Sequence, residues 1–307
     1  MSRILVTGGF GFIGSYICRS LVEKGHMLAV VDVLARPPNL NVLLKRRKGW
    51  SWRYATVYSE DIRKPNIMLR IFKEFRPEVV VHLAAVSSAV YARRHVRETV
   101  ETNILGTYNL LRAAKMLHVE RFVFVSSSMV YGDFIEEPVS EDHPLEPKEI
   151  YGISKLAGER LVRSFMGSPF VIVRPSAVYG PLDSGNRIVQ RFVEAAKKGT
   201  VSEAWDVDER RLDFTYIEDT VDGIVLATQH PRADYGIFNI TRGEGRTIRE
   251  LIDTIKAYAP DWPLRLINRG APMVRRGTLD ISHARSILRY EPKYSLEDGL
   301  AEYWEKV

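Results

Sequence analysis

The sequence contains very little cysteine and no long apolar run. Cys18 is the only cysteine among 307 residues, so no disulfide can form within the chain. A membrane-spanning helix needs about 20 consecutive apolar residues, and no segment of the sequence approaches that length. Met1 is followed almost at once by an apolar run, so we expect no signal peptide and no membrane contact. Together these absences favour a reducing, cytoplasmic location.

The chain also lacks a dominant basic or acidic tract. Its net charge is +6, but the basic residues are scattered, and the densest group, at residues 45–48, is short. A basic surface of this kind suits an anionic substrate as well as nucleic acid, and we expect no nucleic-acid partner. With 45% hydrophobic and 27% charged residues, the composition is that of a soluble globular protein.

A glycine-rich turn follows the first predicted strand. Residues 4–6 form a short apolar run, residues 7–11 are rich in glycine, and from Phe12 the apolar residues recur at helical spacing. A strand, a tight turn and a helix in this order point backbone N–H groups and a helix N-terminus at an anion. The pattern therefore predicts a pyrophosphate-binding turn, with GxxGxxG spacing at Gly8, Gly11 and Gly14.

An acidic residue ends the second predicted strand. The apolar run at residues 27–31 leads to Asp32, about 20 residues beyond the turn, which is the separation seen in dinucleotide-binding folds. Its carboxylate can accept hydrogen bonds from ribose hydroxyls and would repel a 2′-phosphate, which favours NAD over NADP. Arg36 lies close enough to hold that phosphate instead, so NADP remains open.

Strand and helix patterns alternate along the first half of the chain. Apolar runs at 78–83 and 121–126 suit parallel strands covered on both faces, and helices are predicted at 67–75 and 96–117. This order predicts an α/β fold with a doubly wound parallel (Rossmann) sheet. His82, inside the first of these runs, is expected to be a core histidine. Such sheets bind ligands at the carboxyl ends of their strands, where this chain carries Gly8, Asp32, Asp61, Ala84 and Ser127.

A tyrosine and a lysine share one face of the next predicted helix. Tyr151 and Lys155 are four residues apart, so the ammonium group can lie near the phenolic oxygen. We expect its charge to lower a pKa that is otherwise near 10, which would make the tyrosine a general acid or base near neutral pH. The preceding strand ends in serines 126–128, and a hydroxyl there can bind the substrate oxygen whose proton Tyr151 takes.

In combination, these motifs resemble the NAD-dependent epimerase/dehydratase group of extended short-chain dehydrogenases/reductases, which act on nucleotide-sugars. The resemblance runs in family order over nearly the whole chain. The matching segments are TGGFGFIG (7–14), Asp32, Asp61-Ile62, HLAA (82–85), Thr102-Asn103, VSSSMVYG (125–132), YGISK (151–155), RPSAVYGP (174–181), LDFTYIEDTVDGI (212–224), FNI (238–240) and LRYEPKYSLEDGL (288–300).

The resemblance implies a role for each of these residues. It makes NAD the cofactor and Tyr151 the catalytic base, with Lys155 also binding the nicotinamide ribose. Ser127 matches the catalytic serine, with Ser128 as the second choice. The other implied cofactor contacts are Gly8, Gly11, Phe12, Ile13 and Gly14 at the pyrophosphate, Asp32, Asp61 and Ile62 at the adenosine, Leu83, Ala84 and Ala85 supported by Asn103, and Pro175 and Ser176 beside the nicotinamide.

Departures from the family pattern reduce the number of activities that we expect for this chain. Where 4,6-dehydratases of the group carry a glutamate that handles the C5 proton, this chain has Met129, so we do not expect a sugar dehydratase. Leu212 stands where an arginine is usual. Arg210 shares its strand face by period-2 alternation and is the favoured substitute, although a bulge could restore Arg211. The expected substrate contacts are Ser87, Ser127, Ser128, Ala177 (in place of a diphosphate-binding asparagine), Arg210, Arg211 and Arg275, which matches a late arginine that clamps nucleotide phosphates.

The resemblance also implies the domain organisation. An NAD-binding domain would comprise residues 1–174 plus about 212–240, and a smaller, discontinuous α/β substrate domain would comprise about 175–211 plus 241–307. Helices near 96–117 and 151–165 would pair with their copies in a homodimer.

Three functions are compatible with these features. The leading hypothesis is an NAD-dependent nucleotide-sugar 4-epimerase of the UDP-glucose/UDP-galactose type, which works through a 4-keto intermediate and recycles its cofactor. The alternative is a 4-keto-6-deoxy nucleotide-sugar reductase, or another sugar dehydrogenase, which consumes NAD(P)H. A non-catalytic scaffold that binds NAD or RNA has only the basic residues 45–48 in its favour. We expect no metal site.

Overall fold

The computed structural model describes residues 1–34, 55–268, 270 and 274–307. Arg36 and the basic group at 45–48 lie outside these residues, so the predictions that rest on them stay predictions. Within the described part of the chain, no helix combines the length and the apolar character needed to cross a bilayer.

A seven-stranded parallel sheet forms the centre of the protein, in the order β11-β6-β5-β4-β1-β2-β3. The strand order reverses beside β1, so the carboxyl ends of β1 and β4 flank the switch point where such sheets bind their ligands. This arrangement confirms the predicted fold class. The strands are β1 Arg3–Thr7, β2 Met27–Asp32, β3 Ala55–Ser59, β4 Val79–His82, β5 Arg121–Val125, β6 Phe170–Pro175 and β11 Ile237–Ile240.

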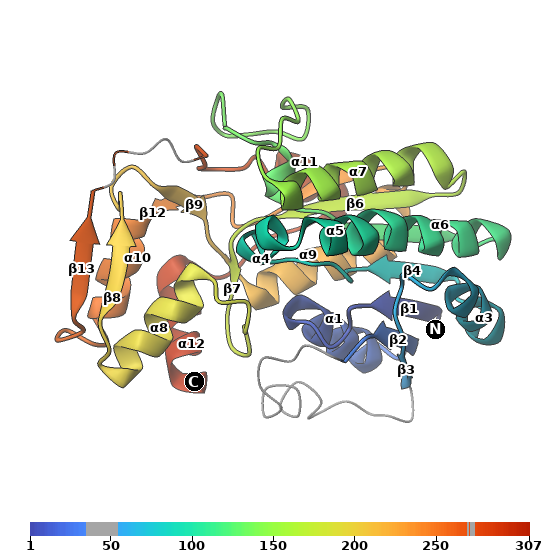
Figure 1. Ribbon diagram of the computed structural model, residues 1–307, viewed down its shortest axis with the longest axis horizontal. Coiled ribbons are helices and arrows are strands. Elements are labelled where there is room, and N and C mark those ends of the chain that lie inside the picture. Colours follow the sequence, from blue (N-terminus) through green and yellow to red (C-terminus); the bar gives the residue numbers. More distant parts are fainter. Residues whose placement is uncertain (35–54, 269, 271–273) are drawn as a thin grey trace.

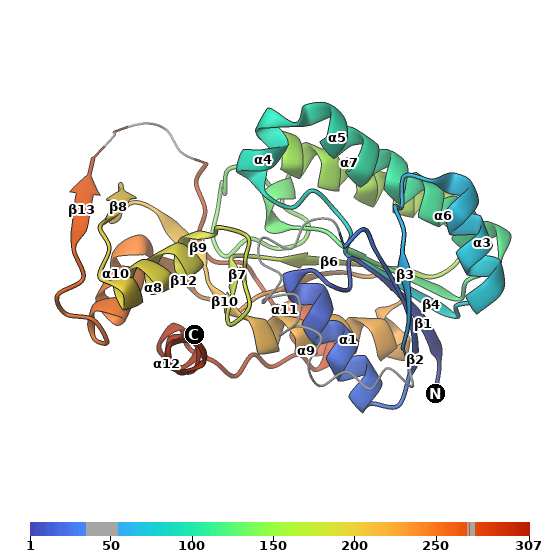
Figure 2. The ribbon, with the colours of Figure 1, turned by 60° about the horizontal axis from the view of Figure 1, so that its bottom comes forward.

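Helices cover both faces of this sheet, as the edge-on view in Figure 2 shows. Consecutive residues of β1 therefore enter two different cores: Ile4 and Val6 pack with the α1 side, whereas Leu5 packs with the α3 and α6 side. Burying each such side chain contributes about 1.5–3 kcal/mol, which explains why the central strands are almost continuously apolar. One layer contains α1 Phe12–Glu23, α9 Ile217–Gln229 and α11 Ser282–Leu288, and the other contains α3 Pro65–Phe75, α6 Thr107–Met116 and α7 Ile150–Phe165.

A smaller part of the molecule projects beyond the carboxyl ends of the strands, at the left of Figure 1. It contains short two-stranded sheets, β8 with β13 and β9 with β12, while β7 pairs with β10. Residues from the predicted 212–240 range divide between the two parts, since β11 joins the main sheet and β9 pairs with β12. The elements are β7 Val178–Tyr179, α8 Ile188–Lys198, β8 Ser202–Trp205, β9 Arg211–Asp213, β10 Thr215–Tyr216, β12 Gly245–Thr247, α10 Ile248–Lys256, β13 Leu264–Ile267 and α12 Leu296–Lys306.

Two predicted elements are interrupted in the structure. The helix expected at 96–117 comprises α5 Val96–Val100, a π-helical stretch Glu101–Gly106, and α6; the helix α4 Ala89–Arg94 precedes it. The matching segment 212–224 begins in two short strands rather than one, because β9 and β10 pair with different strands. The spacing of apolar residues along the sequence does not reveal either interruption. Short 3₁₀ turns complete the structure at Ser128–Val130 and Pro231–Ala233.

Candidate active site

The glycine turn is closely packed between β1, β4 and α1. Gly8 has a φ of +70°, and a Cβ atom there would lie 2.8 Å from the backbone nitrogen of Ala84. A Cβ on Gly14 would lie 2.1 Å from the carbonyl oxygen of Gly8, so only glycine fits at this position. Among the described residues, no side chain caps the N-terminus of α1. Its N–H groups therefore suit a pyrophosphate.

Asp32 is held beside this turn by two backbone donors. Its carboxylate accepts hydrogen bonds from the N–H of Phe10 and of Leu34, both at 3.0 Å. The charge is thus fixed at the end of β2, where a ribose can reach it. NAD fits this site, because the turn leaves no room for a Cβ atom, the helix N-terminus is uncapped and the carboxylate is held in place.

Asn103 connects the expected cofactor wall to the catalytic helix. Its Oδ1 accepts from the N–H of Val86 (2.7 Å), and its Nδ2 donates to the carbonyl of Val86 (3.1 Å) and to Ser154 (2.9 Å). Val86, which follows the segment Leu83–Ala85, is therefore tied to Ser154 of α7 through one buried side chain. Nearer the adenosine end, Ile62 is buried, and Asp61 is paired with Arg63 at 2.6 Å.

His82 lies buried between two threonines. The hydroxyl of Thr107 donates to the carbonyl of Asn103 (2.6 Å), so the Thr107 oxygen accepts from Nε2 of His82 (2.9 Å). The other ring nitrogen of His82, Nδ1, then accepts from the hydroxyl of Thr7 (2.7 Å). Burial, together with the nearby charge of Lys155, holds the pKa of His82 well below its usual value. This neutral, satisfied environment is that of the expected core histidine.

Ser127, Tyr151 and Lys155 are brought together where α7 crosses β5. Gly158 permits the close approach, because a Cβ there would lie 2.4 Å from the ring of Phe124. The same ring receives the ammonium group of Lys155, 4.6 Å from its centroid. The phenol of Tyr151 hydrogen-bonds with Ser127. A tyrosine, a serine and a buried cation are thus arranged for proton transfer to or from one substrate oxygen.

The pKa of Tyr151 differs from the sequence-based expectation. Burial raises it above its usual value, and the charge of Arg187 and the hydrogen bond with Ser127 act in the opposite direction. Burial instead lowers the pKa of Lys155 itself to about 8, against the opposing charge of Glu159. The expected lowering of the tyrosine pKa was therefore wrong, because burial penalises the phenolate by more than the nearby charge and hydrogen bond favour it.

Arg187 is a site residue that the sequence analysis missed. Its guanidinium lies 5.8 Å from the ring of Phe12, at the start of α1, and is held by Asp183 at 2.6 Å. The loop that carries it is fastened to α1, because Tyr16 donates to the carbonyl of Pro181 at 3.0 Å. Arg187 belongs to no motif of regular spacing, so only this folding of the loop over α1 reveals it.

On the substrate side, the guanidinium that reaches the serine turn belongs to Arg276. Its Nη1 donates to Ser128 at 3.4 Å, and its Nε is buried without a hydrogen-bond partner among the described residues. The predicted Arg275, one position earlier, has an exposed side chain and binds Asp133 through its backbone N–H at 2.8 Å. Neighbouring residues in an extended segment point in opposite directions, so Arg276, and not Arg275, contacts the serine turn.

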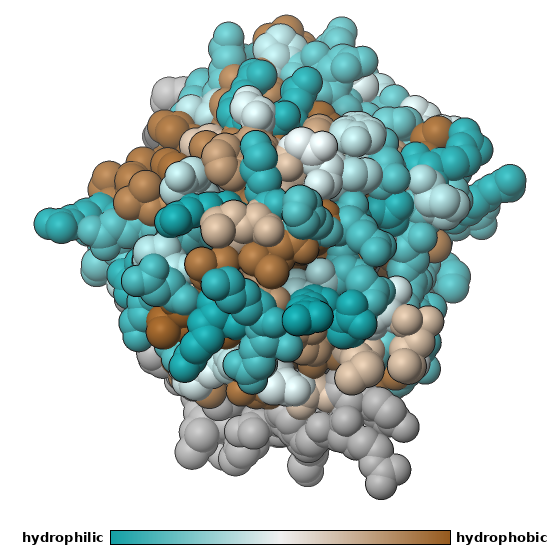
Figure 3. Space-filling model, turned by 90° about the vertical axis from the view of Figure 1, so that its right-hand side faces the viewer, coloured by the Kyte–Doolittle hydropathy of each residue, from teal (hydrophilic) through white to brown (hydrophobic). Residues whose placement is uncertain are grey.

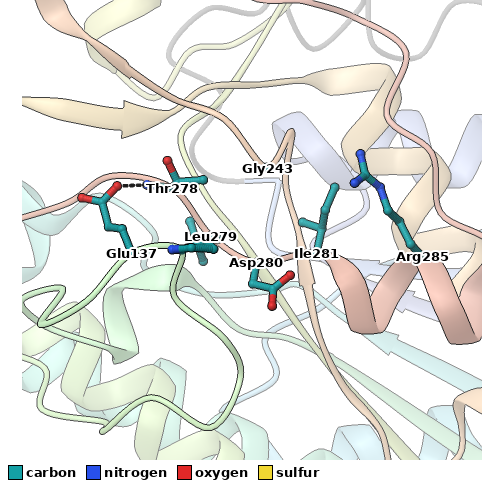
Figure 4. Close-up of a pocket in the computed structure, with 8 residues that line it drawn as sticks. Glu137, Gly243, Thr278, Leu279, Asp280, Ile281 and Arg285 are labelled. Carbon is teal, nitrogen blue, oxygen red and sulfur yellow. Dashed lines mark hydrogen bonds between the residues drawn. The ribbon is translucent and has the colours of Figure 1, made fainter.

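The segment that carries Arg276 is fastened to the loop between β5 and α7. Glu137 accepts from the N–H of Thr278 (2.9 Å), as Figure 4 shows, and Val139 donates to the carbonyl of Thr278 (3.0 Å). Asp213 accepts from the N–H of Leu279 at 3.2 Å, and burial raises the pKa of Asp213 to about 7. Beside this junction lies a pocket of about 370 Å³, which none of the predicted site residues lines.

Most of the other predicted substrate contacts make internal contacts or are exposed. Arg210 donates to the carbonyl of Trp205 (3.4 Å), and Arg211 donates to the carbonyl of Gly245 (3.0 Å) and pairs with Glu137 (3.4 Å). Ala177, with a φ of +36°, follows the predicted nicotinamide contacts Pro175 and Ser176 at the end of β6, and Ser176 lies 3.1 Å from Ser128. Ser87 is exposed before α4.

The glycine turn at the switch point and the serine–tyrosine–lysine cluster define an enzyme of the short-chain dehydrogenase/reductase class. Residues 4–241 match the model of the NAD dependent epimerase/dehydratase family, and the chain belongs to this family. The family, the enzymatic nature and the NAD cofactor predicted from the sequence are thereby confirmed.

Relatives and solved structures agree with this assignment over almost the full length. The chain is 31% identical to UDP-glucose 4-epimerase of Mycolicibacterium smegmatis, over 98% of this chain and 96% of that protein. Its structure is similar to that of UDP-glucose 4-epimerase with UDP-glucose from Thermotoga maritima, with a TM-score of 0.88, 31% identity, and coverage of 99% and 98%. It is also similar to UDP-glucuronic acid 4-epimerase from Bacillus cereus in complex with UDP-glucuronic acid and NAD, with a TM-score of 0.90, 27% identity, and coverage of 99% and 98%.

Proposed function

We propose that this protein is a nucleotide-sugar 4-epimerase of the UDP-glucose/UDP-galactose type. The observation that carries the proposal is the position of Met129, whose N–H donates to the Oγ of Ser127 at 3.2 Å. A thioether beside the catalytic serine cannot transfer a proton, so the site can handle the sugar oxygen but offers no acid or base there for C5. Oxidation and reduction at a single carbon, as in 4-epimerisation, need no such group. The similarity to two UDP-glucose 4-epimerases supports the same substrate.

Each residue of the site would have its own role in the reaction. The glycine turn, Asp32, Lys155 and Ser176 would hold NAD, which when bound accepts the hydride from C4 of the sugar and returns it. Tyr151 takes the O4 proton and later gives it back, while Ser127 holds the same oxygen. Because the pKa of Lys155 is about 8, its ammonium group is charged at neutral pH and can bind a ribose hydroxyl. The net reaction leaves no reduced cofactor.

The proposal is tested by incubating the purified protein with UDP-galactose and no added cofactor. We expect UDP-glucose to form until equilibrium is reached, without net NADH release. If protein-bound NAD is confirmed and no UDP-glucose appears, the substrate assignment fails. Stoichiometric oxidation of NADPH with a 4-keto-6-deoxy nucleotide-sugar would instead support the reductase alternative.

We propose that Arg276 binds the diphosphate of the substrate. Its buried Nε has no hydrogen-bond partner in the described part of the chain, which is costly without an anionic ligand, and a hydrogen bond to a charged group is worth about 1.5–3 kcal/mol. The variant Arg276→Met should therefore raise the KM for UDP-galactose roughly 10- to 100-fold, measured by steady-state kinetics. Arg275→Met is the matched control, because its side chain is exposed. A larger KM effect for the Arg275 variant would contradict the assignment.

We propose a homodimer formed through the helix layer of α6 and α7. Leu105, Tyr108 and Met116 in this layer, and Ile153 on α7, are large apolar side chains exposed to solvent. Figure 3, viewed from the side of α3 and α6, shows apolar residues in patches among polar ones. Contiguous exposed apolar surface favours association.

The dimer is tested by light scattering on a gel-filtration column. We expect the unmodified protein to show twice the chain mass of 35.1 kDa, and Leu105→Glu to shift it toward the monomer. Val201→Glu, which changes an exposed apolar residue outside that layer, should leave the mass unchanged. A monomeric unmodified protein would contradict the proposal.

A further inference from the structure

A fully buried ion pair lies directly behind the catalytic cluster. Glu159 on α7 and Arg174 on β6 have side-chain exposures of only 2% and 1%. The guanidinium binds the carboxylate through both oxygens, with Nε donating to Oε1 at 3.0 Å and Nη2 to Oε2 at 2.7 Å. The proposed chemistry at the sugar oxygen does not use either residue.

Each partner of this pair is also bound to a segment that carries a site residue. Ser126, which precedes the catalytic serine, donates to Oε1 of Glu159 at 2.5 Å. Arg174 immediately precedes the predicted nicotinamide contacts and donates to the phenol of Tyr131 at 3.0 Å. Tyr131 in turn donates to Asn239 of β11 at 2.7 Å. The pair therefore joins the carboxyl ends of β5, β6 and β11 to helix α7.

Stability alone does not account for a buried ion pair in this place. Removing two charges from water costs several kcal/mol for each ion, and replacing such a pair by apolar side chains is often neutral or stabilising. What a bidentate pair supplies is fixed geometry, because a carboxylate and a guanidinium bind in one plane with two parallel hydrogen bonds. The pair thus acts on the relative positions of the segments that it joins.

We infer that Glu159 and Arg174 are positioning residues, which set the spacing between the serine turn, the Tyr151–Lys155 face of α7 and the end of β6. Glu159 lies four residues after Lys155 on the same helix face. The charged and titratable groups that act on this face are His82 from β4, Glu159 from α7 itself, Arg174 with Tyr131 behind Glu159, and Arg187, whose charge acts on Tyr151.

The electrostatic consequence concerns Lys155. Glu159 opposes the effect of burial on this amine, whose pKa is about 8. Loss of the carboxylate lowers the pKa of Lys155 further, so the ammonium group loses its proton at a lower pH. The alkaline limb of the kcat profile should then move to lower pH, whereas a purely structural role would leave it in place.

The experiment compares three variants on the nucleotide-sugar that the unmodified protein converts. The double variant Glu159→Met/Arg174→Met keeps a filled core and leaves neither charge unpaired, so we expect it to remain folded, as its thermal melting curve will show. Its kcat should fall about 100-fold, as displacements of about 1 Å can cause, and its alkaline limb should move to lower pH. Glu159→Gln should move the limb at least as far, because it leaves the Arg174 guanidinium charged without its carboxylate. Glu23→Gln is the control, since it alters an exposed carboxylate–guanidinium pair of α1.

The inference rests on the proposed function only for its substrate. If UDP-galactose is not converted, the proposed function fails. The same variants are then compared by their affinity for NAD and by the pH dependence of that affinity. This affinity should depend on pH because the ammonium group of Lys155 would bind the ribose of NAD. A folded double variant with unchanged kcat and an unchanged alkaline limb would overturn the inference. Unchanged NAD affinity across the pH range would overturn it where no substrate is converted.

Discussion

The variant Tyr151→Phe should lose between about 100-fold and 10,000-fold in kcat, the range that a positioned general acid or base supplies. Phenylalanine keeps the ring but removes the Tyr151 hydroxyl, which hydrogen-bonds with Ser127. The sugar O4 then has no group to take its proton. Bound NAD should be unaffected, because the glycine turn and Asp32 are distant in sequence and held by their own contacts.

This prediction is checked by measuring kcat with UDP-galactose and the NAD content of the purified variant. Tyr58→Phe is the matched control: Tyr58 is also a hydrogen-bonded tyrosine, but its partner is the exposed Glu74 beside β3. Its kcat should remain within a few-fold of the unmodified protein. If Tyr151→Phe keeps most of its activity, another group serves as the base and the proposed mechanism is wrong.

The second large effect is expected for Gly14→Ala. The added Cβ would lie 2.1 Å from the carbonyl oxygen of Gly8, a separation that no two unbonded atoms tolerate. The turn must therefore move away from α1, which displaces the N–H groups that face the pyrophosphate. We expect the purified variant to contain no bound NAD, and the overpacking to lower its stability by about 1–3 kcal/mol.

Gly11→Ala supplies a graded comparison for this prediction. Its Cβ would lie 3.0 Å from the same carbonyl oxygen, so a shift of a few tenths of an ångström relieves the contact. Bound NAD, measured after denaturation of the protein, and the Tm should fall much less than for Gly14→Ala. Equal NAD content in the two variants would show that the turn does not form the pyrophosphate site.

The parts of the fold that could be predicted are those whose signal is local. The strands of the main sheet are covered on both faces, so their apolar runs are continuous and visible in the sequence. The short strands β7, β8 and β12 contain at most four residues each, too few for alternation to be recognised. The π-helical stretch at Glu101–Gly106 buries Asn103 and Gly106 and no large apolar side chain, so the spacing of apolar residues does not reveal it.

The residues of the site could be predicted from their spacing in the sequence, but their pKa values could not. Lys155 was expected to lower the pKa of Tyr151 because the two lie on one helix face. In the structure, burial raises the pKa of the tyrosine and lowers that of the lysine, and the cation that acts on the phenol is Arg187 from a distant loop. Burial is a property of the packed protein, so spacing along one helix does not predict it.

The sequence by itself determined the family, the parallel sheet and the residues at the ends of its strands, because regular spacing and glycine-dependent turns are encoded locally. Only the tertiary structure decided which arginines lie at the candidate active site. Arg276 rather than Arg275 reaches Ser128 because residues 275–280 are fastened to the loop at 133–139 by backbone hydrogen bonds. Arg187 lies over Phe12 because its loop is bound to α1, and Glu159 meets Arg174 because α7 packs against the sheet. These contacts join segments far apart in the chain, and their geometry exists only once the chain is folded.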